Sequence, residues 1–146
     1  MRLHSGYATA YSSRWPALSP IEAARGRIVY GDLLGSGREA AALQVVCFTP
    51  NGTAAGQLAF AVVVYSAGRR APIVLGVLTP RLRSSGTHVP ILTPSAIAHD
   101  EVRMTELFYG SHDADCCPTG VAETVWRFKA GAFGPVSTVV KRKPKR

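Results

Sequence analysis

The sequence Leu58-Ala59-Phe60-Ala61-Val62-Val63-Val64-Tyr65, followed after a turn by Ile73-Val74-Leu75-Gly76-Val77-Leu78, decides the class of fold. Both segments are rich in β-branched and aromatic residues, which favour strands over helices. Each is apolar on both faces, a pattern typical of strands that are covered on both sides. We therefore expect both to be central strands of a sheet.

Further strand signals lie on either side of this pair. They cover Arg27–Tyr30, Ala40–Phe48, Glu101–Phe108, Glu123–Phe128 and Phe133–Val140. Glycine and proline residues separate the segments with turn chemistry. The chain is thus expected to be mainly β, with about seven strands in one antiparallel meander that forms a curled sheet or an open barrel.

The segment Glu101–Phe108 alternates polar and apolar residues, which places Val102, Met104 and Phe108 on one face. Glu106 falls on that apolar face, where an unpaired carboxylate is too costly to persist. A β-bulge, pairing with a buried arginine, or a position at the mouth of a pocket would each resolve the conflict.

The start of the chain carries a helix signal. In Ser19-Pro20-Ile21-Glu22, a capping serine precedes a proline at the first helical position and a glutamate that completes a capping box. We expect one short helix over about residues 20–25, ended by Gly26. The expected organisation is a flexible leader (1–17), a single β-rich domain (18–140) and a basic tail (141–146).

Composition narrows the class of protein. The chain has 146 residues, of which 47% are hydrophobic and 18% charged, as in an ordinary single globular domain. No membrane span is expected, and the start lacks the apolar core of a signal peptide.

The net charge of +8 depends on the tail Lys141–Arg146, which holds five of the 17 basic residues. Such a run is either a solvated tail or an arm that contacts a polyanion.

Chemistry-bearing side chains gather in Ser111-His112-Asp113-Ala114-Asp115-Cys116-Cys117-Pro118. Adjacent Cα atoms lie about 3.8 Å apart, closer than the roughly 5.5 Å that disulfides prefer. We therefore expect a bridge from Cys47 to Cys116 or Cys117, which would imply an oxidising compartment; three reduced thiols are the alternative.

Metal and catalytic roles for this stretch are not favoured. Adjacent cysteines do not follow the ligand spacing of structural zinc, even with His99 in a nearby turn. His112 has no identifiable partner to orient it as a base for a thiol nucleophile. We expect no catalytic residue and no cofactor. The candidate binding residues are Tyr109, His112, Asp113, Asp115 and Trp126.

The segment Asp32-Leu33-Leu34-Gly35-Ser36-Gly37-Arg38-Glu39 has the outline of a calcium loop. Leu34 cannot ligate a cation, and Ser36 is a weaker ligand than a carboxylate. We expect a tight turn that has lost the ion. Weak calcium binding by Asp32, Ser36 and Glu39 is the alternative.

Several motifs together resemble uncharacterised actinobacterial secreted proteins and lipoproteins. They are the degenerate D-x-x-G-x-G loop of Asp32–Gly37, then Cys47, the C-C-P-[ST]-G motif of Cys116–Gly120, and Thr124-Val125-Trp126. The resemblance covers about residues 28–130 and implies an extracellular or cell-envelope location without an assigned activity. Ser36 and Ala40 depart from the acidic residues of that pattern, and the expected signal or lipid-attachment cysteine is missing.

These observations favour a non-enzymatic secreted or envelope-associated β domain that binds a protein or an envelope polymer through the loop Tyr109–Gly120. The alternative is an intracellular basic protein that binds nucleic acid or another polyanion. In that case the contacts would come from the C-terminal tail with Arg69, Arg70, Arg81 and Arg83.

Overall fold

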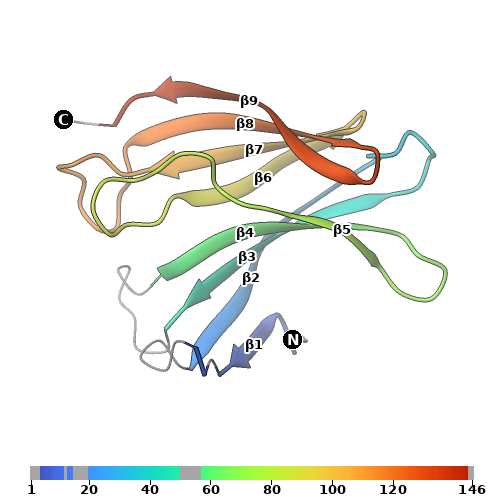
Figure 1. Ribbon diagram of the computed structural model, residues 1–146, viewed down its shortest axis with the longest axis horizontal. Helices are drawn as coiled ribbons and strands as arrows, with labels where there is room; N and C mark the ends of the chain where they lie inside the picture. Colours follow the sequence, from blue (N-terminus) through green and yellow to red (C-terminus); the bar gives the residue numbers. More distant parts are fainter. Residues whose placement is uncertain (1–3, 12, 15–19, 50–56, 145–146) are drawn as a thin grey trace.

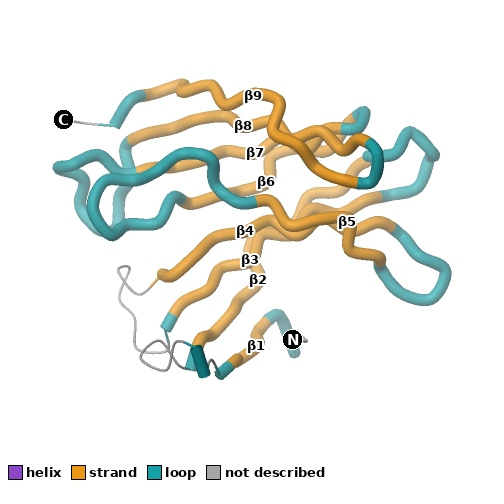
Figure 2. Tube along the Cα trace, viewed as in Figure 1, coloured by secondary structure: helices purple, strands orange, loops and turns teal. Residues whose placement is uncertain are grey.

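The structure is a computed structural model that describes residues 4–11, 13–14, 20–49 and 57–144, and these residues form two antiparallel sheets (Figures 1 and 2). The first sheet contains, in spatial order, β1 (Tyr7–Ala10), β2 (Ile21–Gly31), β3 (Ala40–Phe48), β4 (Gln57–Ser66) and β5 (Ile73–Leu78). The second contains β6 (Ile91–Ala98), β7 (Glu101–Phe108), β8 (Gly120–Lys129) and β9 (Ala132–Arg142). The mainly β class is confirmed. Among these residues, no helix is long and apolar enough to cross a membrane.

The single meander of about seven strands expected from the sequence is wrong. Strands that follow one another in the chain do pair within each sheet, but residues 79–90 cross from β5 to the second sheet without pairing. Pro80 and Pro90 stand in this segment, and proline cannot donate to a strand ladder. The break allows the apolar face of each sheet to be buried against the other.

The expected N-terminal helix is also wrong, because residues 21–31 form β2. In this strand Ala24 pairs with Tyr7 of β1 and with Val46 of β3. A helix of six residues has little stability of its own, so pairing on both sides overrides the capping signal. Ser19, which begins that signal, lies outside the described residues. Since β1 falls within the expected leader and β9 reaches Arg142, the sheets extend beyond both expected domain limits.

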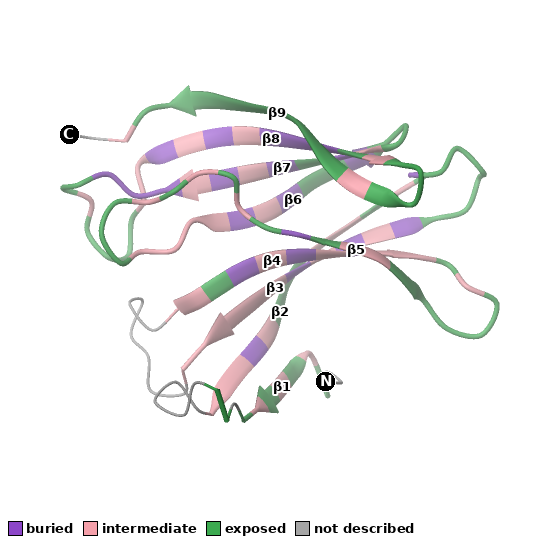
Figure 3. Cartoon of the chain, viewed as in Figure 1, coloured by how far each residue is buried: buried purple, intermediate pink, exposed green. Residues whose placement is uncertain are grey.

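The core lies between the two sheets (Figure 3). Along β4, Val62 and Val64 are fully buried. Gln44 of β3 connects the layers, because its Nε2 donates to the backbone oxygen of Leu92 (2.7 Å) and its Oε1 accepts from Arg27 N–H (3.2 Å). This buried amide thereby joins an irregular point of β2 to the second sheet.

The prediction of two central strands holds only for β4. The segment Ile73–Leu78 is instead β5, the edge strand of the first sheet. Val74 and Val77 are 55% and 58% exposed. An apolar strand face that sequence reasoning assigned to the interior is therefore open to solvent.

Glu106 is fully buried on β7, as the alternation indicated, but its partners are not those expected. Its carboxylate accepts hydrogen bonds from the backbone N–H groups of Arg81 (3.1 and 3.0 Å) and Leu82 (3.0 Å), and from the hydroxyl of Thr124 (2.6 Å). Strands β7 and β8 pair without a register shift. The buried charge is thus satisfied by backbone amides of the crossing segment and by one hydroxyl, rather than by a bulge or a guanidinium group.

The substitution Glu106→Gln should lower the free energy of unfolding by about 1–3 kcal/mol, because the new amide group turns donors toward the N–H groups of Arg81 or Leu82. Urea unfolding followed by circular dichroism measures the change. Glu123→Gln is the matched control, since that side chain is 40% exposed and lies 3.6 Å from Lys141 Nζ. Equal stability of the two variants would contradict the role of Glu106.

Candidate functional site

The loop between β7 and β8, residues 109–119, binds mainly to itself. The carboxylate of Asp113 accepts hydrogen bonds from the N–H groups of Gly110 (2.8 Å) and Thr119 (2.9 Å) and from the Thr119 hydroxyl (2.7 Å). These bonds close the base of the loop. Nearer the tip, Cys117 N–H donates to the backbone oxygen of Ala114 (2.8 Å). Asp113 therefore fixes the shape of the loop.

His88, in the crossing segment, forms a cluster with Tyr109 and Asp115. The His88 ring stacks on Tyr109 with 4.4 Å between ring centroids, and its Nε2 lies 2.8 Å from Asp115 Oδ1. The Tyr109 hydroxyl donates to the backbone oxygen of Asp115 (2.9 Å). Sequence reasoning chose His112 and missed His88, because no motif marks a residue that only the sheet crossing brings to this loop. His112 itself is exposed.

The surroundings of His88 favour its protonated form. Nε2 faces Asp115 and Nδ1 lies 3.3 Å from the backbone oxygen of Ser85, whereas a neutral imidazole can donate from only one nitrogen. The hydrogen bond to Asp115, with the Ser85 contact second, raises the pKa of His88 above its ordinary value. Burial, followed by the charges of Asp115 and Asp113, raises the pKa of Tyr109.

This geometry makes the loop a poor candidate for an open binding site. Tyr109 is 4% exposed, and its hydroxyl is already bound. The remaining exposed side chains in the loop include His112, Asp115 and the two adjacent cysteines. The cluster of His88, Tyr109 and Asp115 instead holds the crossing segment against the loop that follows β7.

The cysteines differ from the expected bridge. The structure places the sulfur atoms of Cys116 and Cys117 at disulfide-bonding distance and leaves Cys47 free. Cys47 lies on β3 opposite Ala23 and Ala59, all in the first sheet, whereas the pair is in a loop of the second sheet. Burial raises the pKa of the Cys47 thiol, which lowers the fraction present as the reactive thiolate.

Trp126 does not join the loop. It lies on β8 opposite Val102 of β7, is 8% exposed and belongs to the core, so its assignment as a binding residue is corrected. The Arg81 guanidinium lies 5.9 Å from its ring centroid. Burial of the aromatic ring, the ordinary fate of a strand tryptophan, outweighs its capacity to stack on a ligand.

The basic side chains do not form one surface. Arg69 and Arg70 precede β5, whereas Arg81 and Arg83 follow it, so the two pairs lie at opposite ends of that strand (Figure 1). Lys141 lies 3.6 Å from a Glu123 oxygen, and Arg142 Nε donates to the backbone oxygen of Thr119 (2.7 Å). Residues 145–146 of the basic tail lie outside the described part of the chain.

The segment after β2 forms a tight turn. The Asp32 carboxylate accepts hydrogen bonds from the N–H groups of Ser36 (3.2 Å) and Gly37 (2.9 Å), while Gly35 and Gly37 have φ values of 62° and 70°. The carboxylate that would be the first calcium ligand is thus bound to its own loop. In the part of the chain that the structure describes, no group of three or more His, Cys, Asp or Glu side chains is placed to hold a metal ion.

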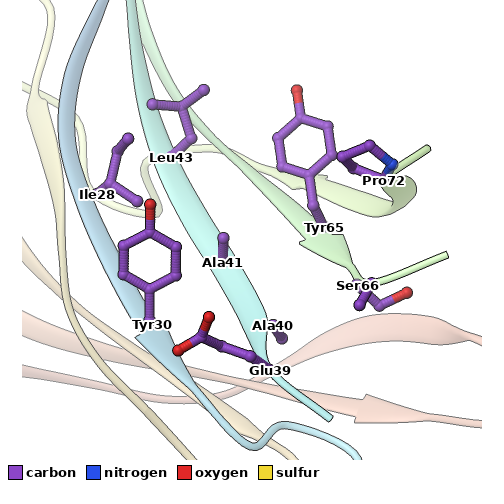
Figure 4. A pocket seen from close by; sticks show the side chains of 10 residues that line it. Ile28, Tyr30, Glu39, Ala40, Ala41, Leu43, Tyr65, Ser66 and Pro72 are labelled. Carbon is purple, nitrogen blue, oxygen red and sulfur yellow. The ribbon is translucent and has the colours of Figure 1, made fainter. Parts of the chain in front are cut away.

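A groove of about 390 Å³ lies on the side of the first sheet that faces away from the core (Figure 4). Tyr30 of β2 and Tyr65 of β4 both pair with Ala41 of β3, so the two tyrosines stand on either side of an alanine floor. Figure 4 shows both rings projecting to the same side of the sheet, with the Glu39 carboxylate near Tyr30.

The groove belongs to a larger surface, which we call the apolar outer face. It consists of two rows that cross β2, β3, β4 and β5: Tyr30, Ala41, Tyr65 and Val74, then Ile28, Leu43, Val63 and Val77. None of these side chains is charged. Sequence reasoning missed this surface, although strands that are apolar on both faces were its signal.

The chain matches no protein-family model, and no match was found among curated proteins or solved structures.

The His88–Asp115 contact should make stability depend on pH. Because the folded-state pKa of His88 is raised, its contribution is complete below the ordinary value of 6.5 and is lost as pH rises through the folded-state pKa. We expect the melting temperature to fall over that range in the native chain but not in Asp115→Asn. His112→Gln is the control and should retain the dependence. NMR titration of His88 that gives an ordinary pKa would contradict this account.

The cysteine arrangement predicts one alkylated thiol after denaturation without reductant. Peptide mapping should locate the label at Cys47 and find a single tryptic peptide that contains Cys116 and Cys117 and is two hydrogens lighter than its reduced form. A cross-linked pair of peptides joining Cys47 to either residue would refute the arrangement.

Proposed function

We propose that this protein is a non-enzymatic binding module whose partner is a protein that docks on the apolar outer face. The observation that carries the proposal is the pair of uncharged rows across four strands. Within them Tyr30, Val74 and Val77 are each more than half exposed. Contiguous exposed apolar surface of this kind marks interaction sites, because leaving it in water costs free energy that docking recovers.

The contrast with β9 supports this assignment. β9 is an edge strand that carries Pro135, Lys141 and Arg142 and has two register shifts against β8. Prolines, cations and bulges at an edge are the devices by which proteins avoid unwanted strand pairing. The chain thus protects this edge while leaving the outer face of the first sheet without a single charge in its two rows.

An extracellular or cell-envelope location is part of the proposal. It is supported by the placement of Cys116 and Cys117 at disulfide-bonding distance, since disulfides persist mainly in oxidising compartments. The resemblance to actinobacterial secreted proteins favours the same location. Binding of nucleic acid through the tail is less favoured, because Lys141 and Arg142 already contact Glu123 and Thr119.

The substitution Val77→Lys tests the proposed face. Peptides selected from a random displayed library on the immobilised native protein should be apolar, and this variant should bind them about tenfold more weakly, because a charge then stands in the contact. Val139→Lys on β9, where the side chain is 49% exposed, is the matched control and should bind normally. Circular dichroism verifies that both variants fold. Equal binding by both variants, or no selected peptide, would refute the proposed face.

A further inference from the structure

Resting on this proposed function, we propose that the groove between Tyr30 and Tyr65 binds an extended, proline-containing segment of the partner that carries a basic residue. The groove is lined by side chains from β2, β3 and β4 and by the turn that follows β4: Ile28, Tyr30, Glu39, Ala40, Ala41, Leu43, Tyr65, Ser66, Ala67 and Pro72. Three properties of this lining lead to the proposal: its width, its backbone and its charge.

The width fits a single chain. Neighbouring strands lie about 4.8 Å apart, so two residues that flank a common partner strand are separated by about 9.6 Å. Tyr30 and Tyr65 flank Ala41 in this way, and the alanine methyl leaves the space between them open. Figure 4 shows the two rings on either side of Ala41. A spacing of about 9.6 Å between the flanking residues leaves room above Ala41 for one extended segment.

The backbone beneath the groove has no hydrogen bonds to offer. Both β2 and β4 are paired with β3, so the floor of the groove is an intact ladder. A segment that lies on this floor finds no backbone partner there, so its own N–H groups must turn to water or to the few polar side chains of the lining. Proline has no N–H group, and a polyproline II segment needs no backbone partners. Aromatic-lined grooves are the usual docking sites for such segments.

The negative charge of the groove favours a basic residue beside the prolines of the bound segment. Glu39 is the one charged side chain among the described lining residues, and it lies near Tyr30 at one end of the slot (Figure 4). A carboxylate beside an apolar surface forms strong, charge-assisted hydrogen bonds with arginine or lysine. An arginine that follows the prolines can lay its methylene groups along Tyr30 and reach Glu39.

A glycan is the other occupant that two tyrosines suggest, since sugar rings also stack on aromatic side chains. The lining favours the peptide, because its polar side chains are limited to two tyrosine hydroxyls, Ser66 and Glu39. A sugar ring presents several hydroxyl groups, and those without a partner would be buried at a cost. Binding of a glycan is therefore one of the outcomes that the test distinguishes.

The test uses the full chain and a synthetic peptide with two prolines, separated by two residues, and one arginine after them. Fluorescence anisotropy should show saturable binding that is about tenfold weaker for Tyr30→Ala and for Tyr65→Ala. Tyr7→Ala is the matched control, because Tyr7 is 61% exposed on β1, outside the groove. Glu39→Gln should weaken binding of this peptide but not of a peptide in which alanine replaces the arginine.

Each alternative result overturns the inference. Equal loss with both peptides on Glu39→Gln would exclude the basic contact, and saturable binding of a chito-oligosaccharide in place of the peptide would identify a glycan site. If the proline peptide fails while selected peptides still lose affinity on Val77→Lys, the proposed function stands and this inference falls. If Val77→Lys also changes nothing, both fall.

Discussion

The buried carboxylate of Glu106 is the constraint on which the arrangement of this protein depends. A charge at the centre of an apolar sheet face is tolerated only where donors surround it. Here Arg81 and Leu82 supply backbone N–H groups from the segment that crosses between the sheets, and Thr124 supplies a hydroxyl. These bonds tie the segment that changes sheets to β7 of the second sheet. The same segment then carries His88 to the loop beyond β7.

The positions of the strands could be predicted from the sequence more reliably than the division of those strands between two sheets. Alternation in Glu101–Phe108 correctly placed Glu106 inside, because the period of a strand depends only on local geometry. The helix expected at residues 20–25 failed because pairing with β1 and β3 outweighs a cap. The contact of His88 with Asp115, and the placement of Cys47 and the cysteine loop in different sheets, depend on which sheet each strand joins. No local pattern encodes that choice.

The candidate binding surface also could not be predicted from the sequence alone. Strands that are apolar on both faces predict cover on both sides, and in the described structure this holds for only one face of the first sheet. What the sequence cannot say is whether the second cover comes from the chain itself. In the described structure the second sheet covers one face of the first, while Tyr30, Val74 and Val77 on the other face remain largely in solvent. We propose that a partner protein supplies that second cover.

The most direct test of this central claim measures the solvent exposure of valine methyl groups in the free protein, by NMR relaxation with a soluble paramagnetic agent. The account predicts strong relaxation at Val74 and Val77 and weak relaxation at Val62 and Val64, which are fully buried on the neighbouring strand. Equally weak relaxation at all four residues would contradict it, because the outer face would then be covered by the chain itself and would not be available to a partner.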